Sequence, residues 1–355
     1  MLTFQPGALR AVTHLIASRM GSNDAEASEV ADHLVRANLA GHDSHGVGML
    51  PTYVRLLGDK LLVPNQTAET ILDAGALLVI DAKRGYGQRM AADAVRRAIA
   101  KAREHGACVL AFRNSAHIGR IGTYAELATR EGCAFTSFVN VADHHDVQAT
   151  YGAAEPRLGT NPFTVGVPGP NGEPMVLDMA TTSIAAGKAR VAFNKGIPVP
   201  DDSLIDAAGN PTNDAAGFIR DKAGALKSFG LHKGSGLAVM CEIMATAVAG
   251  GQGAWQPAKG GVLNSMLAII IDLSKIGDPA AITAAVGATR DHIKSAKPAQ
   301  GTAEVLTPGE PERRSAQRRA TGIEIDETSW RDIRVAALSL GITKQAFDQA
   351  AGANA

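Results

Sequence analysis

The chain has 355 residues, with 35 basic and 35 acidic side chains and an aromatic content of 4%. This length can bury a large core and corresponds to roughly two or three structural units. Balanced charge gives no general attraction to nucleic acid, and so few aromatic residues leave little surface for stacking bases. The apolar runs are far shorter than the ~20 residues that cross a bilayer. We therefore expect a protein that binds neither nucleic acid nor a membrane.

The three cysteines, Cys108, Cys133 and Cys241, lie in apolar runs without a CxxC spacing. This pattern is typical of small core residues in a reducing compartment. The first ten residues also lack the basic and apolar regions of a signal peptide. We expect a cytoplasmic protein.

The first part of the chain predicts two amphipathic helices, 7–20 and 23–40, the second opened by a capping box of Asn23 and Glu26. A further helix is predicted over 51–62. Between them lies the octapeptide 41–48, which holds His42, Asp43, Ser44 and His45 among three glycines. A polar cluster on a turn at a helix end suits a rigid general acid or base. The alternative is a solvated surface turn.

The next region alternates strands and helices, which indicates parallel strands in an α/β layer. The predicted elements are a strand at 76–81, a helix at 88–104, a strand at 107–112, a helix at 120–131 and a strand at 133–141. The turn 113–122 contains His117 and Arg120 and lies between a strand and a helix. Free backbone N–H groups at such a turn attract anions, so we expect a ligand there. The alternative is a glycine-bearing connection with a satisfied histidine.

The second half of the chain is less regular. In order, we predict a loop-rich segment at 142–175, a strand at 175–179, a helical run to Phe193 capped by Thr182 or Ser183, a turn-rich excursion at 196–225, an apolar helix at 237–249, a strand at 264–273, a helix at 279–294, a linker at 295–312, a basic helical stripe at 313–319 and two short helices within 328–350.

Two further polar groups invite a functional interpretation. The quartet 143–146, Asp-His-His-Asp, has the composition of a metal site, but adjacent histidines rarely face one ion and such sites need three or more ligands. We predict no metal. The pair His232-Lys233 precedes an apolar helix in a glycine turn, as in a phosphate or carboxylate cradle. Lys188 and Arg190 either bind an anionic group or face solvent.

Several catalytic motifs are absent. No G-x-G-x-x-G follows a strand, which excludes a Rossmann dinucleotide site, and neither G-x-S-x-G nor HExxH occurs. The remaining motifs nevertheless occur in a distinctive order. The landmarks are Asp43-Ser44-His45-Gly46, Asn114-Ser115-Ala116-His117-Ile118-Gly119, Gly159-Thr160-Asn161-Pro162, Leu177-Asp178-Met179-Ala180-Thr181, Gly187-Lys188, His232-Lys233-Gly234 and Pro308-Gly309-Glu310.

In these motifs, over nearly its whole length, the chain resembles the malate/L-lactate dehydrogenase family of non-Rossmann NAD(P)-dependent oxidoreductases. Residues 37–46 and the tail 324–330 fit the hydroxycarboxylate dehydrogenase branch. The resemblance implies a mixed-sheet, three-layer α/β fold with a helical region built from both chain ends. It also implies a homodimer that binds NAD, with NADP as the alternative, near the subunit interface. The expected units are a helical region at 1–72, a cofactor- and substrate-binding region at 73–309 and C-terminal helices at 310–355.

The resemblance also assigns roles to residues. The catalytic candidates are His45, His117 and Asp178, and the acid/base role is divided between the two histidines. Asp178 or Asp43 is expected to orient an imidazole, and Lys188, Arg120 or Lys233 to hold a substrate carboxylate. The expected cofactor contacts are His45, Gly119, Arg120, Ile121, Val176, Leu177, Asp178, Met179, Ala180, His232, Lys233, Gly234, Gly309, Glu310, Pro311 and Glu312.

The expected substrate contacts are Ser44, His45, Met49 and Lys188. Many relatives have an arginine where this chain has Met49, so an apolar 2-oxo acid fits better than a small diacid. The implied reaction is reversible hydride transfer between NAD(P)H and a 2-oxo acid, with imidazole as acid or base. The alternatives are a cyclic imino-acid reductase, a metal-dependent hydrolase using His42, His45, His144 and His145, and a binding protein without turnover.

Overall fold

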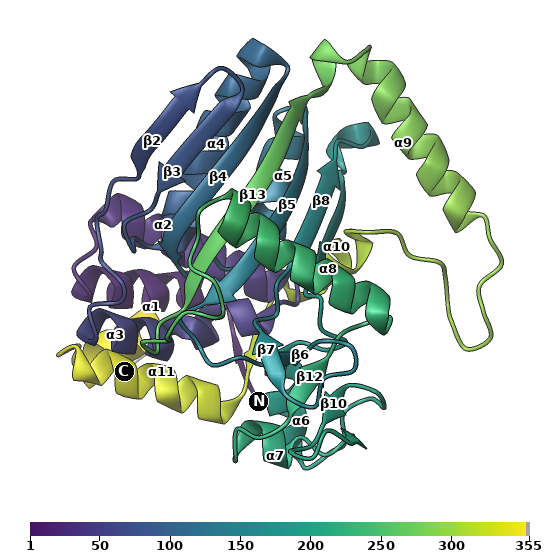
Figure 1. Ribbon diagram of the computed structural model, residues 1–355. Helices are drawn as coiled ribbons and strands as arrows, with labels where there is room; N and C mark the ends of the chain where they lie inside the picture. The colour runs from purple at the N-terminus through teal and green to yellow at the C-terminus, as the bar shows by residue number, and fades with distance from the viewer. Residues whose placement is uncertain (353–355) are drawn as a thin grey trace.

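The fold is built on a seven-stranded mixed sheet, seen in a computed structural model that describes residues 1–352 (Figure 1). The strand order is β2-β3-β4-β13-β5-β8-β9, and only β3 and β4 run parallel as neighbours. The bounds are β2 (Glu69–Ala74), β3 (Leu77–Asp81), β4 (Ala107–Ala116), β5 (Cys133–Ala142), β8 (Phe163–Val167), β9 (Met175–Met179) and β13 (Leu263–Asp272).

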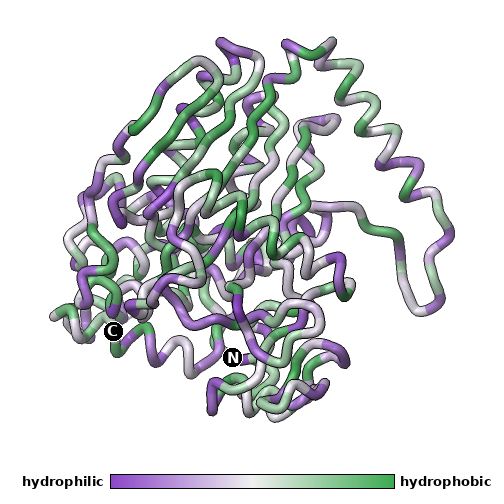
Figure 2. Tube along the Cα trace, viewed as in Figure 1, coloured by the Kyte–Doolittle hydropathy of each residue, from purple (hydrophilic) through white to green (hydrophobic). Residues whose placement is uncertain are grey.

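Helices cover both faces of this sheet. On one face, α4 (Gly87–His105) and α5 (Gly122–Arg130) bury alanine, valine and isoleucine side chains at helical spacing. On the other face, α8 (His232–Ile243) and the π-helix η4 (Met244–Val248) lie across β5 and β13 (Figure 1). Figure 2 shows the strands between these layers as largely hydrophobic. The predicted mixed-sheet, three-layer α/β fold is confirmed.

The central strand β13 separates the two parallel strands that the β-turn-α-β order predicts. Both β4 and β5 pair antiparallel with β13, which lies between them although it comes more than a hundred residues later in the chain. The β4-α5-β5 segment therefore does place two strands in the same direction, but not side by side. Strand β13 is mostly apolar, and eight of its ten residues are buried, because it contacts neighbours on both edges and both faces.

The two ends of the chain build a separate apolar cluster. Its members include Leu9, Leu34, Tyr53, Ile333 and Phe347, all at most 2% exposed. The elements are β1 (Leu2–Phe4), α1 (Pro6–Arg19), α2 (Asp24–Leu39), the short 3-10 helices η1 (Asp43–His45) and η2 (Val47–Met49), α3 (Leu50–Gly58), α10 (Glu310–Arg319), β14 (Ile323–Ile325), α11 (Glu327–Ser339) and α12 (Lys344–Ala350). Strands β1 and β14 pair antiparallel and tie the two ends together.

A smaller five-stranded sheet in the order β11-β10-β12-β6-β7 packs with α6 and α7 around a third cluster that includes Leu204 and Leu226. Its elements are β6 (Gln148–Ala149), β7 (Pro156–Leu158), α6 (Ala186–Lys195), β10 (Leu204–Ile205), β11 (Pro211–Thr212), α7 (Ala216–Ile219) and β12 (Ala225–Lys227). The turns η3 (Pro170–Gly172) and η5 (Leu273–Lys275) complete the set, and α9 (Pro279–Lys294) extends away from the body (Figure 1).

Most of the predicted elements are confirmed within a few residues, and the helix at 279–294 and the strand at 175–179 have the predicted bounds. Several predictions were wrong or incomplete. The sequence did not reveal β1, β14 or β2, and the segment taken as loop contains β6, β7 and β8. Helix α6 begins at Ala186 without a side-chain cap, because Thr182 forms a β-bridge with Ser228 and the backbone of Ser183 bonds Lys227.

Helix α8 begins at His232, five residues before the predicted start, and α10 begins at Glu310, inside the predicted linker. His232, Lys233 and Gly234 therefore form the first turn of a helix rather than a loop before it. Among residues 1–352, no helix combines the length and the apolar character that a bilayer crossing requires.

Candidate active site

Two imidazoles lie side by side where the helical region meets the sheet. His45 ends η1, just after α2, and His117 follows β4. Their rings stack with centroids 5.4 Å apart and planes inclined by 24°. Both residues are half-buried. The structure therefore brings together the two histidines between which the sequence left the acid/base role divided.

Both rings are neutral at pH 7. Burial lowers the pKa of His45 to about 4, with the nearby His42 adding to the effect and the charge of Asp178 opposing it. Burial also lowers the pKa of His117 well below its ordinary value, with further contributions from His45 and His33. A neutral imidazole carries one donor and one acceptor nitrogen, so each ring can either give or take a hydrogen bond.

A buried asparagine holds the turn that carries His45. The Asn38 side chain accepts a hydrogen bond from the Val47 backbone at 2.9 Å and donates one to Asp43 at 2.7 Å. A Cβ at Gly46 would lie 2.2 Å from Asn38 Oδ1, so only glycine allows this approach. Asp43 also pairs with Arg319 at 2.7 Å. Asp43 thus braces the turn and does not contact an imidazole, contrary to one expectation; His45 Nδ1 contacts Ser44 Oγ instead, at 2.9 Å.

His117 is held from two other directions. Its Nδ1 lies 2.8 Å from the Tyr53 hydroxyl, which also accepts a hydrogen bond from Gln88 at 2.7 Å. The next backbone N–H, that of Ile118, donates to Asn264 Oδ1 on β13 at 2.9 Å. Tyr53 and Gln88 are each 2% exposed. The ring therefore sits between helix α3, helix α4 and the central strand.

Three backbone N–H groups of the turn after β4 are satisfied within the protein. Alternate groups are paired: Ile118 N donates to Asn264, Arg120 N to His33 Nε2 at 3.1 Å and Gly122 N to Asp178 Oδ2 at 2.7 Å. The expectation that free N–H groups there attract an anion is thus corrected at these three positions. Burial lowers the pKa of His33 to about 3, so this histidine is a neutral acceptor at pH 7.

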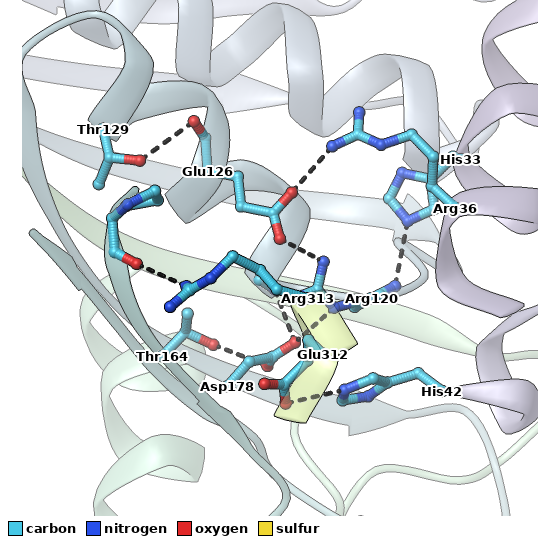
Figure 3. A network of polar contacts seen from close by, with 12 residues as sticks. His33, Arg36, His42, Arg120, Glu126, Thr129, Thr164, Asp178, Glu312 and Arg313 are labelled. Carbon is cyan, nitrogen blue, oxygen red and sulfur yellow. Dashed lines mark hydrogen bonds and ion pairs between the residues drawn. The ribbon is translucent and has the colours of Figure 1, made fainter. Parts of the chain in front are cut away.

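Figure 3 shows a charged network around Arg120, and the charges of Arg120 and Asp178 in this network act on His45. The Arg120 guanidinium contacts Glu126 at 2.6 Å and Asp178 at 3.6 Å, and Arg36 contacts Glu126 at 2.8 Å. Burial alone would lower the pKa of Arg120, but the charges of Glu126 and Asp178 outweigh it and raise the pKa. Burial alone would raise the pKa of Glu126, and Arg120 likewise lowers it. Arg120 and Glu126 are therefore charged at pH 7.

Two residues of this network, Arg120 and Asp178, were expected to hold a substrate carboxylate and to orient an imidazole. Arg120 is 4% exposed and already bound to carboxylates, so its side chain is not free to hold a substrate carboxylate. Asp178 accepts hydrogen bonds from Gly122 N and from Thr164 Oγ1, the latter at 3.1 Å, and none from an imidazole among the described residues. Its charge nevertheless acts on His45.

Three of the expected cofactor segments meet at this network. A Cβ on Gly309 would lie 3.3 Å from Val176 N, so the start of α10 packs against the backbone of β9. Glu312 Oε1 on α10 lies 3.4 Å from His42 Nε2 (Figure 3), and the other oxygen, Glu312 Oε2, is buried without a hydrogen-bond partner among residues 1–352. A buried, unpaired carboxylate oxygen is a fitting acceptor for a sugar hydroxyl.

Two other expected contact regions have exposed cations. His232 and Lys233 are exposed at the start of α8, where the His232 ring packs edge-on against Tyr151 with centroids 5.9 Å apart. Lys188 is exposed on the first turn of α6. A Cβ on the neighbouring Gly187 would lie 2.7 Å from Ser44 Cβ, so this turn abuts the His45 segment. Met49 packs partly against the apolar cluster of the helical region.

The candidate metal quartet does not converge on one point. The Asp143 carboxylate accepts a hydrogen bond from the Lys259 backbone and faces Arg84 at 3.5 Å, while the rings of His144 and His145 pack against each other with centroids 3.9 Å apart. Within the described part of the chain, no three His, Cys, Asp or Glu side chains are placed to share a metal ion.

Sequence reasoning missed the residues that position the imidazoles, namely Asn38, Tyr53, Gln88 and Asn264. Each is a polar side chain that the fold buries. A polar residue on the apolar face of a predicted helix, or within a predicted buried strand, is the signal that would have found them, because such groups are normally hydrogen-bonded. The partners of Asn38 lie five and nine residues away. The partners of Tyr53, Gln88 and Asn264 are 35 or more residues away and could not be read from the sequence.

The chain is similar to known dehydrogenases over most of its length. The family model described as malate/L-lactate dehydrogenase matches residues 4–334. Hydroxycarboxylate dehydrogenase B of Escherichia coli K12 is 41% identical over 98% of this chain and 97% of its own length. L-lactate dehydrogenase of Cupriavidus necator is 38% identical over 89% and 91%. The solved structure of sulfolactate dehydrogenase from Methanocaldococcus jannaschii superposes with a TM-score of 0.85 at 31% identity, covering 96% of this chain and 98% of that one.

Proposed function

The chain belongs to the malate/L-lactate dehydrogenase family, and we propose that it is an NAD-dependent 2-hydroxycarboxylate dehydrogenase with His45 and His117 at its reacting centre. The observation that carries the proposal is the neutral, half-buried imidazole pair. A neutral imidazole can take the proton of an alcohol or hydrogen-bond a carbonyl oxygen near neutral pH.

The nicotinamide cofactor, when bound, supplies or accepts the hydride. In the oxidation direction, the substrate loses a hydride from C2 and a proton from the hydroxyl oxygen, and His45 takes the proton on a ring nitrogen. In the reduction direction, the same proton returns to the oxygen. An anionic substrate beside the ring favours the imidazolium, so its binding shifts the pKa of His45 upward from about 4 toward the working pH.

The charges around the pair limit which groups hold the substrate carboxylate. Arg120 is committed to Glu126 and Asp178. Lys188 is exposed on the turn that abuts Ser44 and is the better candidate. Met49, with its apolar side chain, offers no second cation. These features support a 2-oxo acid with one carboxylate and an apolar side chain as the substrate class.

Residues around the charged network would hold the cofactor. They are the turn Gly119–Ile121, the end of β9 from Val176 to Ala180 and the start of α10 from Gly309 to Glu312. The unpaired Glu312 Oε2 supports this assignment because it can accept a hydrogen bond from a ribose hydroxyl. His232, Lys233 and Gly234 are proposed to contact the cofactor from α8, where the exposed cation suits a phosphate.

The test is a panel of aliphatic and aromatic 2-oxo acids with NADH and with NADPH, followed by the absorbance of the reduced nicotinamide. We expect turnover with monocarboxylic 2-oxo acids, higher with NADH than with NADPH. Absence of turnover with every 2-oxo acid, despite binding of NADH in a fluorescence titration, would contradict the proposal and leave a binding protein.

A cyclic imino-acid reductase is the second candidate, since the same imidazole pair can hydrogen-bond or protonate a ring nitrogen. The same panel with a cyclic 2-carboxy imine, and with 2-oxo acids plus an amine, separates the two. Turnover confined to the imine or to the amine-containing mixtures favours the reductase.

We also propose that the chain acts as a homodimer in the cytoplasm. The apolar side chains of Val239, Met240, Ile243 and Val248 on α8 and η4 are 37–56% exposed, which supports a contact with a second copy. The three cysteines are free and buried, which supports a reducing compartment. Light scattering on the purified protein would test the dimer. The division into units at residues 72 and 309 stays a prediction.

A further inference from the structure

A buried amide and a buried phenol form a chain of hydrogen bonds that ends at His117 Nδ1. Gln88 Nε2 donates to Tyr53 Oη at 2.7 Å, and Tyr53 Oη lies 2.8 Å from His117 Nδ1. Both residues are 2% exposed, so water does not compete for these atoms. A phenol has one hydrogen. Because Gln88 already donates to its oxygen, that hydrogen is directed to His117 Nδ1.

We propose that Gln88, acting through Tyr53, fixes the tautomer of His117 so that Nδ1 is always the acceptor and Nε2 carries the hydrogen. The inference rests on the proposed function and names two positioning residues for it. His117 Nε2 has no hydrogen-bond partner among residues 1–352. With its hydrogen held on Nε2, the ring is a preset donor for the oxygen on the C2 atom of a 2-oxo acid, where negative charge grows during hydride transfer.

The contrast with His45 assigns different tasks to the two rings. Among residues 1–352, the one hydrogen-bond partner of His45 Nδ1 is Ser44 Oγ, a rotatable hydroxyl that can donate or accept. The tautomer of His45 is therefore free to change during turnover, whereas that of His117 is not. His45 can exchange the proton while His117 keeps donating to the same oxygen.

The direct test is the nitrogen NMR spectrum of the protein labelled with 15N-histidine, with NADH bound. The His117 signals are identified by their loss in His117→Asn. We expect Nδ1 to have the chemical shift of an unprotonated nitrogen and Nε2 that of an N–H. The reverse assignment overturns the proposal. This readout needs no substrate, so it is independent of whether the 2-oxo acid panel supports the proposed function.

Two substitutions at Gln88 separate positioning by hydrogen bonding from simple packing. In Gln88→Glu, the ionised carboxylate can only accept a hydrogen bond, so the Tyr53 hydroxyl donates to it. Tyr53 then accepts a hydrogen bond from His117 Nδ1–H. The ring hydrogen therefore lies on Nδ1, and Nε2 is no longer a donor. In Gln88→Met, Tyr53 can still donate to Nδ1. We therefore expect Gln88→Glu to lose at least about tenfold in kcat as pH rises through the titration of the new carboxyl, and Gln88→Met to lose less. A purely structural role predicts the opposite order, because glutamate is nearer to glutamine in shape.

Tyr53→Phe removes the donor to Nδ1 and has a matched control in Tyr86→Phe. The Tyr86 ring packs edge-on against Tyr53, with ring centroids 5.9 Å apart, and is as deeply buried. Its hydroxyl donates a hydrogen bond to Met20 Sδ rather than to a histidine. We expect Tyr53→Phe to lower kcat at least about tenfold with an unchanged Kd for NADH, and Tyr86→Phe to leave kcat within about twofold. Equal losses in both variants would overturn the inference.

Discussion

The imidazole pair and the Arg120 network are both largely withdrawn from water, yet their ionisation differs. Arg120 and Glu126 stay charged because they lie 2.6 Å apart and each offsets the effect of burial on the pKa of the other. Among residues 1–352, no carboxylate is in hydrogen-bond contact with His45 or His117, and burial, together with neighbouring histidines, keeps both rings neutral. The comparison shows that the partner, rather than the depth of burial, decides which groups of this site are charged.

This difference also separates two tasks. The charged network connects α2, α5, β9 and the turn after β4, and it holds those elements together (Figure 3). The neutral pair keeps its ring nitrogens available for a proton. A charge that is fully paired cannot take part in proton exchange near neutral pH, whereas a neutral imidazole can.

The largest effect is expected from removing the cation of the charged network. Arg120→Met leaves Glu126 and Asp178 without their buried cation, and we expect a loss of about 3–5 kcal/mol in the free energy of unfolding. Arg130→Met is the matched control, because Arg130 also contacts Glu126, at 3.6 Å, but its side chain is 59% exposed; its loss should stay below about 1 kcal/mol. Urea unfolding measures both. Similar losses in the two variants would show that the network is not held by Arg120.

Breaking the neutral half should affect turnover instead of stability. We expect His45→Ala to lower kcat by about 10²-fold or more while NADH still binds, because the group that exchanges the proton is gone. His14→Ala is the control, since His14 lies on α1 and pairs with Asp24 near the surface. Steady-state kinetics and a fluorescence titration of NADH provide the measurement. Near-normal turnover of the His45 variant would remove this residue from the mechanism.

The neutral histidines also predict how stability depends on pH. The pKa of His33 is about 3 in the folded chain against an ordinary value of 6.5, so the unfolded chain binds the proton more readily. Such a group makes its full contribution to the free energy of unfolding above pH 6.5, and this contribution is lost as pH falls toward 3. At pH 5 the loss is about 2 kcal/mol per group.

His33→Gln isolates this effect, because glutamine keeps an acceptor for the Arg120 backbone but does not titrate. We expect the drop in unfolding free energy between pH 7 and pH 5 to be about 2 kcal/mol smaller in this variant than in the unchanged protein. Urea titrations at the two pH values give the comparison, and an identical drop in both proteins would contradict the neutral state of His33.

The smallest effect is expected from adding a cation near the neutral imidazole pair. Met49→Arg places a cation four residues after His45, where a second substrate carboxylate could bind. We expect the ratio of kcat/KM for a dicarboxylic over a monocarboxylic 2-oxo acid to rise about tenfold, since one charge-assisted hydrogen bond contributes about 1.5–3 kcal/mol. Met49→Leu, which keeps the apolar packing, should leave the ratio unchanged. A similar ratio in both variants would place Met49 away from the substrate.

Local sequence determined much of this protein. Apolar spacing predicted α1, α2, α4 and α9 nearly to the residue, because helical periodicity is a short-range signal. The polar turn at 42–45 and the motif around His117 were also visible without a structure. The short strands β1 and β14 were not, because each is only three residues long and pairs with the other end of the chain.

Only the tertiary structure decided how the site is assembled. It inserted β13 between β4 and β5, placed Asn264 against the backbone of Ile118 and put Tyr53 between Gln88 and His117. These partners are 35 to 146 residues apart in the chain. The sequence names the side chains that can ionise, but their protonation depends on which charges and donors the fold places beside them, and no local pattern encodes that distance.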